Sequence, residues 1–168
     1  LKHTLDYLKI GATISNRSEE ILNAKRIILP GVGAFAAGMT ELKKKGLVEI
    51  LNDYVETGKP LLGICLGMQL LMTSSNEYGN HKGLGYVKGK VLLFNFFYKN
   101  KIKFKVPQIG WNNISFNSKN KDRNKSTFAN GLFKKQKDRS YLYFIHSYYI
   151  LVENPKEILT TTEYAKTI

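Results

Sequence analysis

The stretch LLGICLGMQL contains the single cysteine of this chain, Cys65. Gly63 and Gly67 stand two residues to either side, and this G-x-C-x-G pattern copies the strand–turn–helix elbow that presents a nucleophile and is usually written with serine. The glycines allow a sharp turn without a Cβ clash and place the thiol at the start of a helix, whose dipole favours thiolate. The pentapeptide alone leaves two interpretations open, because a lone cysteine is often inert packing.

A second glycine-rich stretch, LPGVGAF at residues 29–35, follows a short apolar segment. Ligand sites in open α/β sheets lie at the carboxyl ends of the strands. A lone G-x-G is usually a tight turn, but acyl transfer needs backbone N–H groups that converge on a developing oxyanion. Paired with the elbow one strand later, the stretch predicts an oxyanion hole with one donor from Leu66 and one from the PGVG strand.

Alternating strands and helices are expected to position these residues, which is typical of an α/β fold with a largely parallel sheet. The pattern predicts strands at 12–15, 26–30 and 59–64, a short turn at 18–22, and helices at 1–8, 38–45, 47–57 and 66–72. From residue 83 the pattern changes to β, with alternation over 83–94, strand and turn over 107–116, a polar loop at 117–126 and one long aromatic strand over 141–151. We therefore predict one domain, 1–168, in which an open, largely parallel sheet with flanking helices carries additional antiparallel strands.

The formal charge of +13 first suggests a nucleic-acid partner. Lys supplies 22 of the 26 basic residues, together with many Asn and Ile, which is the signature of a codon bias toward A and T. Residues 99–140 carry ten Lys and two Arg against two Asp. Because this basic segment lacks the aromatic and glycine patterns of RNA-binding modules, we interpret it as a solvated face or a protein interface and predict no nucleic-acid partner.

Length and cysteine content exclude several classes of protein. No apolar run approaches the ~20 residues that span a bilayer, and no signal-like leader is present, so we predict a soluble cytoplasmic protein without a membrane partner. One cysteine forms no internal disulfide and supplies no CxxC pair. We accordingly expect neither a metal site nor a cofactor.

PGVG followed by GICLGMQLL, GLG, PQIGWN and YFIHSYY resembles the glutaminase subunits of imidazole glycerol phosphate synthases, which are class I (triad-type) glutamine amidotransferases with a flavodoxin-like fold. The resemblance covers nearly the whole chain. It implies that Cys65 attacks the side-chain amide carbon of glutamine and releases ammonia, after which water resolves the thioester to glutamate. It also implies a heterodimer with a cyclase subunit, a (β/α)8 barrel that uses the ammonia in histidine biosynthesis.

The resemblance assigns roles to further residues by their place in these motifs. It implies an oxyanion hole made by Val32, Gly33 and Leu66, and a glutamine pocket made by Gly31, Gln69, His146, Ser147 and Tyr148. It places Gln108, Ile109 and Trp111 in the region that docks the cyclase. From the residues alone, Trp111 fits a core position equally well, and Gln69 fits a solvated helix position.

One departure from the family concerns the catalytic base, which the family supplies from an HPE motif. The chain contains His3, His81 and His146, and none is followed by x-Glu. On the residues alone His146 is the candidate base, whereas the resemblance places it in the substrate pocket. Because the chain also starts without Met and stops at TTEYAKTI, we expect a fragment clipped at both ends that is inactive alone.

Three interpretations of the function stay open at this point. The first is the glutaminase of histidine biosynthesis. The second is a related amidotransferase that feeds a sugar-modifying enzyme of surface-polysaccharide synthesis, for which Gln108, at a position where histidine-pathway members often have His, leaves room. The third is a binding or regulatory scaffold in which Cys65 is buried and inert.

Overall fold

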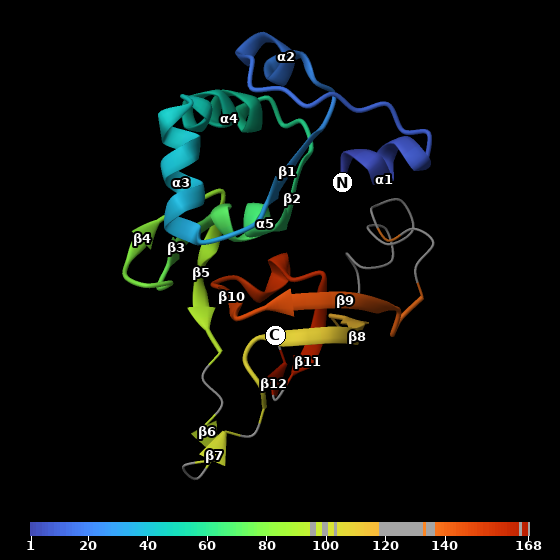
Figure 1. Cartoon of the computed structure of the whole chain (residues 1–168), viewed down its shortest axis with the longest axis vertical. Coiled ribbons are helices and arrows are strands. Elements are labelled where there is room, and N and C mark those ends of the chain that lie inside the picture. The colour runs from blue at the N-terminus through green and yellow to red at the C-terminus, as the bar shows by residue number, and fades with distance from the viewer. Residues whose placement is uncertain are drawn as a thin grey trace. The chain divides into compact units, whose positions relative to one another are not determined.

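The computed structural model describes residues 1–94, 97–98, 101–102, 104–117, 133, 137–164 and 166–167, which form two compact units (Figure 1). The first unit comprises Leu1–Ser75 and Gly79–Tyr86, and the second comprises Asn76–Tyr78 and Val87–Ile168. The cysteine elbow and the PGVG stretch belong to the first unit. The PQIGWN and YFIHSYY stretches belong to the second.

The first unit combines helices with a parallel pair of strands. Its elements are α1 (Lys2–Tyr7), α2 (Ser18–Asn23), β1 (Ile27–Gly31), α3 (Phe35–Lys44), α4 (Leu47–Glu56), β2 (Leu61–Cys65), α5 (Leu66–Leu70), β3 (Met72–Ser75) and β4 (His81–Lys82). β1 and β2 pair in parallel, and β3 and β4 pair antiparallel. Because parallel strands end at the same edge, β1 and β2 bring the two glycine-rich stretches side by side.

The core of the first unit forms where α3 and α5 meet. Phe35, Met39 and Leu42 recur at helical spacing on α3 and are buried, as are Leu66 and Leu70 on α5. A Cβ at Gly38 would lie 3.2 Å from side-chain atoms of both leucines. The glycine therefore lets α3 approach α5 closely, and α5 starts at the cysteine.

The second unit is built from strands. Its elements are β5 (Val87–Leu93), β6 (Phe97–Tyr98), β7 (Lys101–Ile102), β8 (Gln108–Phe116), β9 (Tyr141–His146), β10 (Tyr148–Val152), the 3-10 turn η2 (Pro155–Glu157), β11 (Thr160–Tyr164) and β12 (Lys166–Thr167). β8 pairs antiparallel with β9 and with β11, which also pairs with β12. β10 pairs antiparallel with β5, and β6 with β7.

The α/β class and the antiparallel strands predicted from the sequence are confirmed. The predicted strands at 26–30 and 59–64 are β1 and β2, and the predicted helices at 38–45 and 47–57 are α3 and α4. The strand predicted at 12–15 is wrong, because residues 11–17 have no regular structure. The helix predicted at 66–72 ends at Leu70, and Met72 already belongs to β3.

The predicted single strand at 141–151 is also wrong, because it divides into β9 and β10 at Ser147. β9 pairs with β8, whereas β10 pairs with β5, so the two halves have different neighbours. The Ser147 carbonyl accepts a 2.9 Å hydrogen bond from the Phe94 amide beside β10. Aromatic composition predicts extended structure over the whole run but does not reveal a change of pairing partner.

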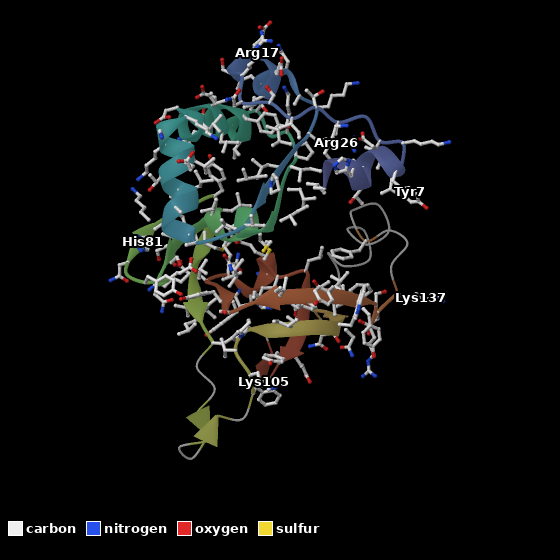
Figure 2. The ribbon with its side chains drawn as sticks, in the orientation of Figure 1. Tyr7, Arg17, Arg26, His81, Lys105 and Lys137 are labelled. Carbon is white, nitrogen blue, oxygen red and sulfur yellow. The ribbon has the colours of Figure 1, made fainter. Side chains whose placement is uncertain are left out.

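Basic side chains extend outward in both units, as Figure 2 shows for Arg17 before α2 and Lys137 before β9. Half of the basic segment 99–140, and the polar loop predicted at 117–126 apart from Asn117, lie outside the described residues. Within the part of the chain that the structure describes, no helix has the length and apolar character needed to cross a bilayer.

Candidate active site

Cys65 occupies the junction between β2 and α5 in a backbone conformation that side chains rarely adopt. Its φ is 55° and its ψ is −121°, and the residue is exposed. A non-glycine residue at positive φ costs of order 1–3 kcal/mol, and such strain persists where the surrounding structure enforces it. The thiol therefore projects from a sharp strand-to-helix turn, as the G-x-C-x-G pattern predicts, and the exposure removes the premise of a buried, inert cysteine.

The two glycines of the elbow are required by close contacts of the backbone. A Cβ at Gly67 would lie 1.8 Å from the carbonyl oxygen of Leu29, and one at Gly63 would lie 2.6 Å from the Cα of Met68. Neither position tolerates a side chain, because both neighbours are backbone atoms. The steric role predicted for these glycines is thus confirmed, and it extends to the contact between the elbow and β1.

The PGVG stretch lies directly beside the cysteine. Gly31, the last residue of β1, is opposite Cys65 in the parallel register. Val32 follows with 91% of its side chain exposed, and Gly33 has a φ of +98°, which favours glycine. The arrangement places backbone N–H groups of the PGVG stretch and the first amides of α5, which have no intrahelical acceptor, at one edge of the sheet.

Gln69 lies four residues after Cys65 on α5 and is partly buried. Cys65 precedes the helix with a non-helical φ and ψ, so helical spacing does not fix how Gln69 lies relative to the thiol. Gln69 also makes contacts of its own within the protein. Its proposed contact with glutamine therefore stays a prediction.

In the second unit, His146 is the cross-strand partner of Gln108. The Nδ1 of His146 lies 2.8 Å from the Tyr148 carbonyl oxygen, which requires that Nδ1 carries the proton and leaves Nε2 as an acceptor. Burial against the ring of Phe94, whose centroid is 5.0 Å away, lowers the pKa of His146 from its usual 6.5, and the hydrogen bond to Tyr148 opposes this only in part. His146 is consequently neutral at pH 7.

Two buried acceptor atoms occur at this pair of residues. Among the described residues neither the Nε2 of His146 nor the Oε1 of Gln108 has a hydrogen-bond partner, and Gln108 is 3% exposed. Buried polar atoms are nearly always paired with protein, water or ligand, so both atoms suit a molecule that donates hydrogen bonds. The neighbouring Tyr148 has a raised pKa, chiefly through burial and secondly through the charge of Glu77, and its phenol stays protonated.

The residues expected at the partner interface divide between the two faces of β8. Ile109 is 59% exposed and Trp111 is 70% exposed, whereas Gln108 faces the interior. Their cross-strand partners Ile145 and Tyr143 are exposed as well, and Tyr141 continues the row on β9. We call these five residues, Ile109, Trp111, Tyr141, Tyr143 and Ile145, the β8–β9 apolar face.

Sequence reasoning missed the three β9 members of this face. Tyr141, Tyr143 and Ile145 alternate along the strand, and alternation was the signal that could have found them. The intervening Leu142 and Phe144 masked it, because they leave no polar residue from 141 to 145 that marks the opposite face. Among the described residues, no three His, Cys, Asp or Glu side chains gather in a group that could hold a metal ion.

The chain is similar to known proteins over its whole length. A family model described as "Glutamine amidotransferase class-I" matches residues 1–168. A protein of Methanococcus maripaludis named imidazole glycerol phosphate synthase subunit HisH 2 is 46% identical over 165 residues, which is 98% of this chain and 74% of the relative. Proteins named imidazole glycerol phosphate synthase subunit HisH are 39% identical in Chlorobaculum tepidum, over 95% of this chain and 72% of the relative, and 42% identical in Lactiplantibacillus plantarum, over 98% and 71%.

The fold is also similar to a solved structure. A chain described as "Crystal structure of glutamine amidotransferase" matches with a TM-score of 0.62 and 17% identity, over 98% of this chain and 78% of that chain. At this identity the likeness concerns the fold alone.

Proposed function

The chain belongs to the class-I glutamine amidotransferase family, and we propose that it is the glutaminase subunit of an imidazole glycerol phosphate synthase, which hydrolyses glutamine to glutamate and supplies ammonia to a cyclase subunit for histidine biosynthesis. The observation that carries the proposal is the strained, exposed Cys65 opposite Gly31 at the edge where β1 and β2 end. The compartment we propose for this reaction is the cytoplasm.

In the proposed reaction the Cys65 sulfur forms a bond to the amide carbon of the glutamine side chain. The carbonyl oxygen becomes an oxyanion that backbone N–H groups of Val32, Gly33 and Leu66 stabilise. The C–N bond then breaks, ammonia leaves with a proton, and a thioester remains. Water adds to the thioester, and collapse of the second oxyanion releases glutamate and the thiol.

For glutamine recognition we propose the residues that the family resemblance assigns, namely Gly31, Gln69, His146, Ser147 and Tyr148. Within the second unit, the unpartnered Nε2 of His146 supports this assignment, because glutamine carries an α-ammonium and an amide that both donate. Gln108 presents a second free acceptor beside it, so we move Gln108 from the partner interface to this recognition group.

The proton shuttle is assigned by family resemblance to a His-x-Glu pair, which does not occur in residues 1–168. We therefore propose that a polypeptide limited to these residues reacts with a glutamine-analogue electrophile at Cys65 but does not turn over glutamine. The experiments below use the full-length protein.

The partner proposed is the cyclase subunit, a (β/α)8 barrel in a heterodimer. The β8–β9 apolar face supports this, since contiguous exposed apolar patches mark interaction surfaces. At the centre of this face, the rings of Trp111 and Tyr143 pack edge to face, with their centroids 5.6 Å apart. Aromatic residues of this kind are typical anchors of protein interfaces.

Of the two alternatives, neither gains support from the structure or the relatives. The relatives described above are all named as subunits of imidazole glycerol phosphate synthase, which favours histidine biosynthesis over polysaccharide synthesis. The inert scaffold required a buried cysteine, and Cys65 is exposed.

Replacing the nucleophile tests the proposed function. We expect Cys65→Ala in the full-length protein to lower the kcat for glutamine hydrolysis by at least about 10⁴-fold, because no other group forms the thioester. Affinity for the cyclase and ammonia-dependent cyclisation by the complex should be unchanged. Glutamate release and ring formation are measured in parallel, with Met68→Ala, one turn away at an exposed position, as the matched control. Retained glutamine hydrolysis in Cys65→Ala would refute the assignment.

A further inference from the structure

A cavity of about 270 Å³ lies in the first unit, on elements that do not carry the cysteine. Met39 and Lys43 of α3 line one wall, and Val48 and Asn52 of α4 line the second. The segment 82–84, which begins on β4 next to His81, completes it (Figure 2). This volume is near the lower end of the range for small-molecule pockets and fits a molecule the size of a substituted ring.

The charged side chains of this lining are both cationic and both uncompensated. Neither Lys43 nor Lys82 forms an ion pair with any residue that the structure describes, whereas Lys45, two positions after Lys43, lies 3.7 Å from Glu41. No carboxylate lines the cavity. Lys43 and Lys82 are exposed residues of this lining, so two cationic side chains without an ion pair to a described residue border the same small volume.

The third polar lining residue, Asn52, also offers an N–H donor. The hydroxyl of Tyr86 donates a 2.8 Å hydrogen bond to the Oδ1 of Asn52, which orients this amide and leaves its Nδ2 as a donor. Burial raises the pKa of Tyr86 to about 12, which keeps the phenol protonated and this orientation fixed. Lys43, Lys82 and Asn52 thus present N–H donors to whatever occupies the cavity.

The remaining lining is apolar and its backbone is fixed. Met39 is buried, and Val48 and Leu84 are half-buried. The Leu84 amide donates to the Leu70 carbonyl at 2.9 Å, and Gly83 is packed so tightly that a Cβ would lie 2.2 Å from the Met72 carbonyl oxygen. The backbone contacts of the protein itself therefore hold this wall in place.

We propose that this cavity binds a small organic anion, a carboxylate or phosphate monoester whose head group contacts Lys43, Lys82 and Asn52 and whose short apolar body contacts Met39, Val48 and Leu84. Two cationic side chains and an amide donor favour an anionic head, and the apolar wall selects against a bare inorganic ion. None of these residues belongs to the proposed glutaminase site, so this binding is independent of the proposed function. Refuting one of the two proposals therefore leaves the other unaffected.

Calorimetric titration of the full-length protein with 1-naphthyl phosphate tests the proposal. We expect saturable binding at one site with a Kd below about 1 mM, at least tenfold weaker binding of inorganic phosphate, and at least tenfold weaker binding of the uncharged 1-naphthalenemethanol. 2-Naphthoate should bind within tenfold of the phosphate ester, because the recognised feature is the charge.

Charge variants locate the site. Lys43→Gln and Lys82→Gln should each weaken 1-naphthyl phosphate at least fivefold, and the double variant at least twentyfold, without a change in circular dichroism. Lys44→Gln is the matched control, since it removes the same charge from the neighbouring exposed position of α3 and should leave the Kd within twofold. Absence of saturable binding, or equal affinity of the double variant and Lys44→Gln, would overturn the proposal.

Discussion

Backbone conformation at position 65 links the residue to its chemistry. The φ of 55° at Cys65 occurs in a tightly packed turn that requires glycine on both sides, because a Cβ at Gly63 would lie 2.6 Å from the Met68 Cα and one at Gly67 would lie 1.8 Å from the Leu29 carbonyl oxygen. The strain is maintained by the packing of α5 against β1 and β2. Reactivity at the thiol should therefore depend on glycines that never touch the substrate.

Gly67→Ala is predicted to disrupt the elbow. The added Cβ meets the Leu29 carbonyl, a backbone atom that cannot yield, so the free energy of unfolding should fall by about 3 kcal/mol or more, with glutamine hydrolysis lost. Gly11→Ala is the control, because its Cβ would have nothing within 4 Å. Denaturant unfolding and glutaminase assays on both variants check this; a Gly67→Ala protein with wild-type stability would show that the elbow is not closely packed.

His146 is predicted to make stability depend on pH. Its folded-state pKa is lowered by burial, so below the unfolded-state value of about 6.5 the unfolded chain binds more protons, and the free energy of unfolding falls as the pH falls. His146→Asn, whose amide can still donate to the Tyr148 carbonyl, should show a smaller decrease between pH 7.5 and 5.5. The exposed His3→Asn serves as the control. Identical pH profiles of stability for the wild type and His146→Asn would show that His146 is not a source of the pH dependence.

At the scale of elements, β8 and β9 separate two roles by the alternation of their residues. The exposed β8–β9 apolar face consists of odd-numbered residues of both strands, whereas the even-numbered cross-strand pair Gln108 and His146 faces inward. Successive side chains of a strand point to opposite faces, so one antiparallel pair can carry the proposed recognition group on one side and the proposed docking surface on the other.

Trp111→Ala is predicted to weaken the complex with the cyclase without unfolding the subunit. With 70% of the side chain exposed, the loss of its contact with Tyr143 should cost about 1 kcal/mol of stability or less. Loss of an aromatic anchor should reduce affinity by about 2 kcal/mol, or about 30-fold, mainly through faster dissociation.

Tyr7→Ala is the matched control for this variant, because Tyr7 is 86% exposed at the end of α1 (Figure 2) and is not a member of the β8–β9 apolar face. It should leave affinity unchanged. Surface plasmon resonance and thermal unfolding of both variants distinguish the outcomes. A Trp111→Ala protein that melts, or that binds normally, would show that the docking surface lies elsewhere.

For the whole molecule, we expect the charge of +13 to affect the rate of association with a partner. Charge distributed over a surface acts mostly on association rate and is screened by salt, whereas apolar anchors act on residence time. We therefore expect the association rate constant with the cyclase to fall at least about tenfold between about 20 and 300 mM NaCl, while the dissociation rate changes little. Stopped-flow mixing measures both rate constants. An association rate constant that does not depend on salt would show that the lysines are merely solvated and do not accelerate association.

The sequence by itself determined the chemistry-bearing turn, because its requirements are local. The spacing of Gly63, Cys65 and Gly67 predicts a strand, a turn and a helix in that order, and the structure has them. The apolar segments at β1 and β2 and the periodic helices α3 and α4 were likewise predictable, since burial imposes their periods on the sequence.

Only the tertiary structure decided which segments pair and which face each side chain takes. Nothing local distinguishes residues 141–146 from 148–152, yet β9 joins β8 and β10 joins β5. Gln108 and Trp111 stand three positions apart in one motif, but strand alternation buries the first and exposes the second. The cavity lined by Lys43, Asn52 and Lys82 likewise exists only because α3, α4 and the segment 82–84 converge there. Contacts between residues distant in the sequence depend on packing that no short sequence pattern encodes.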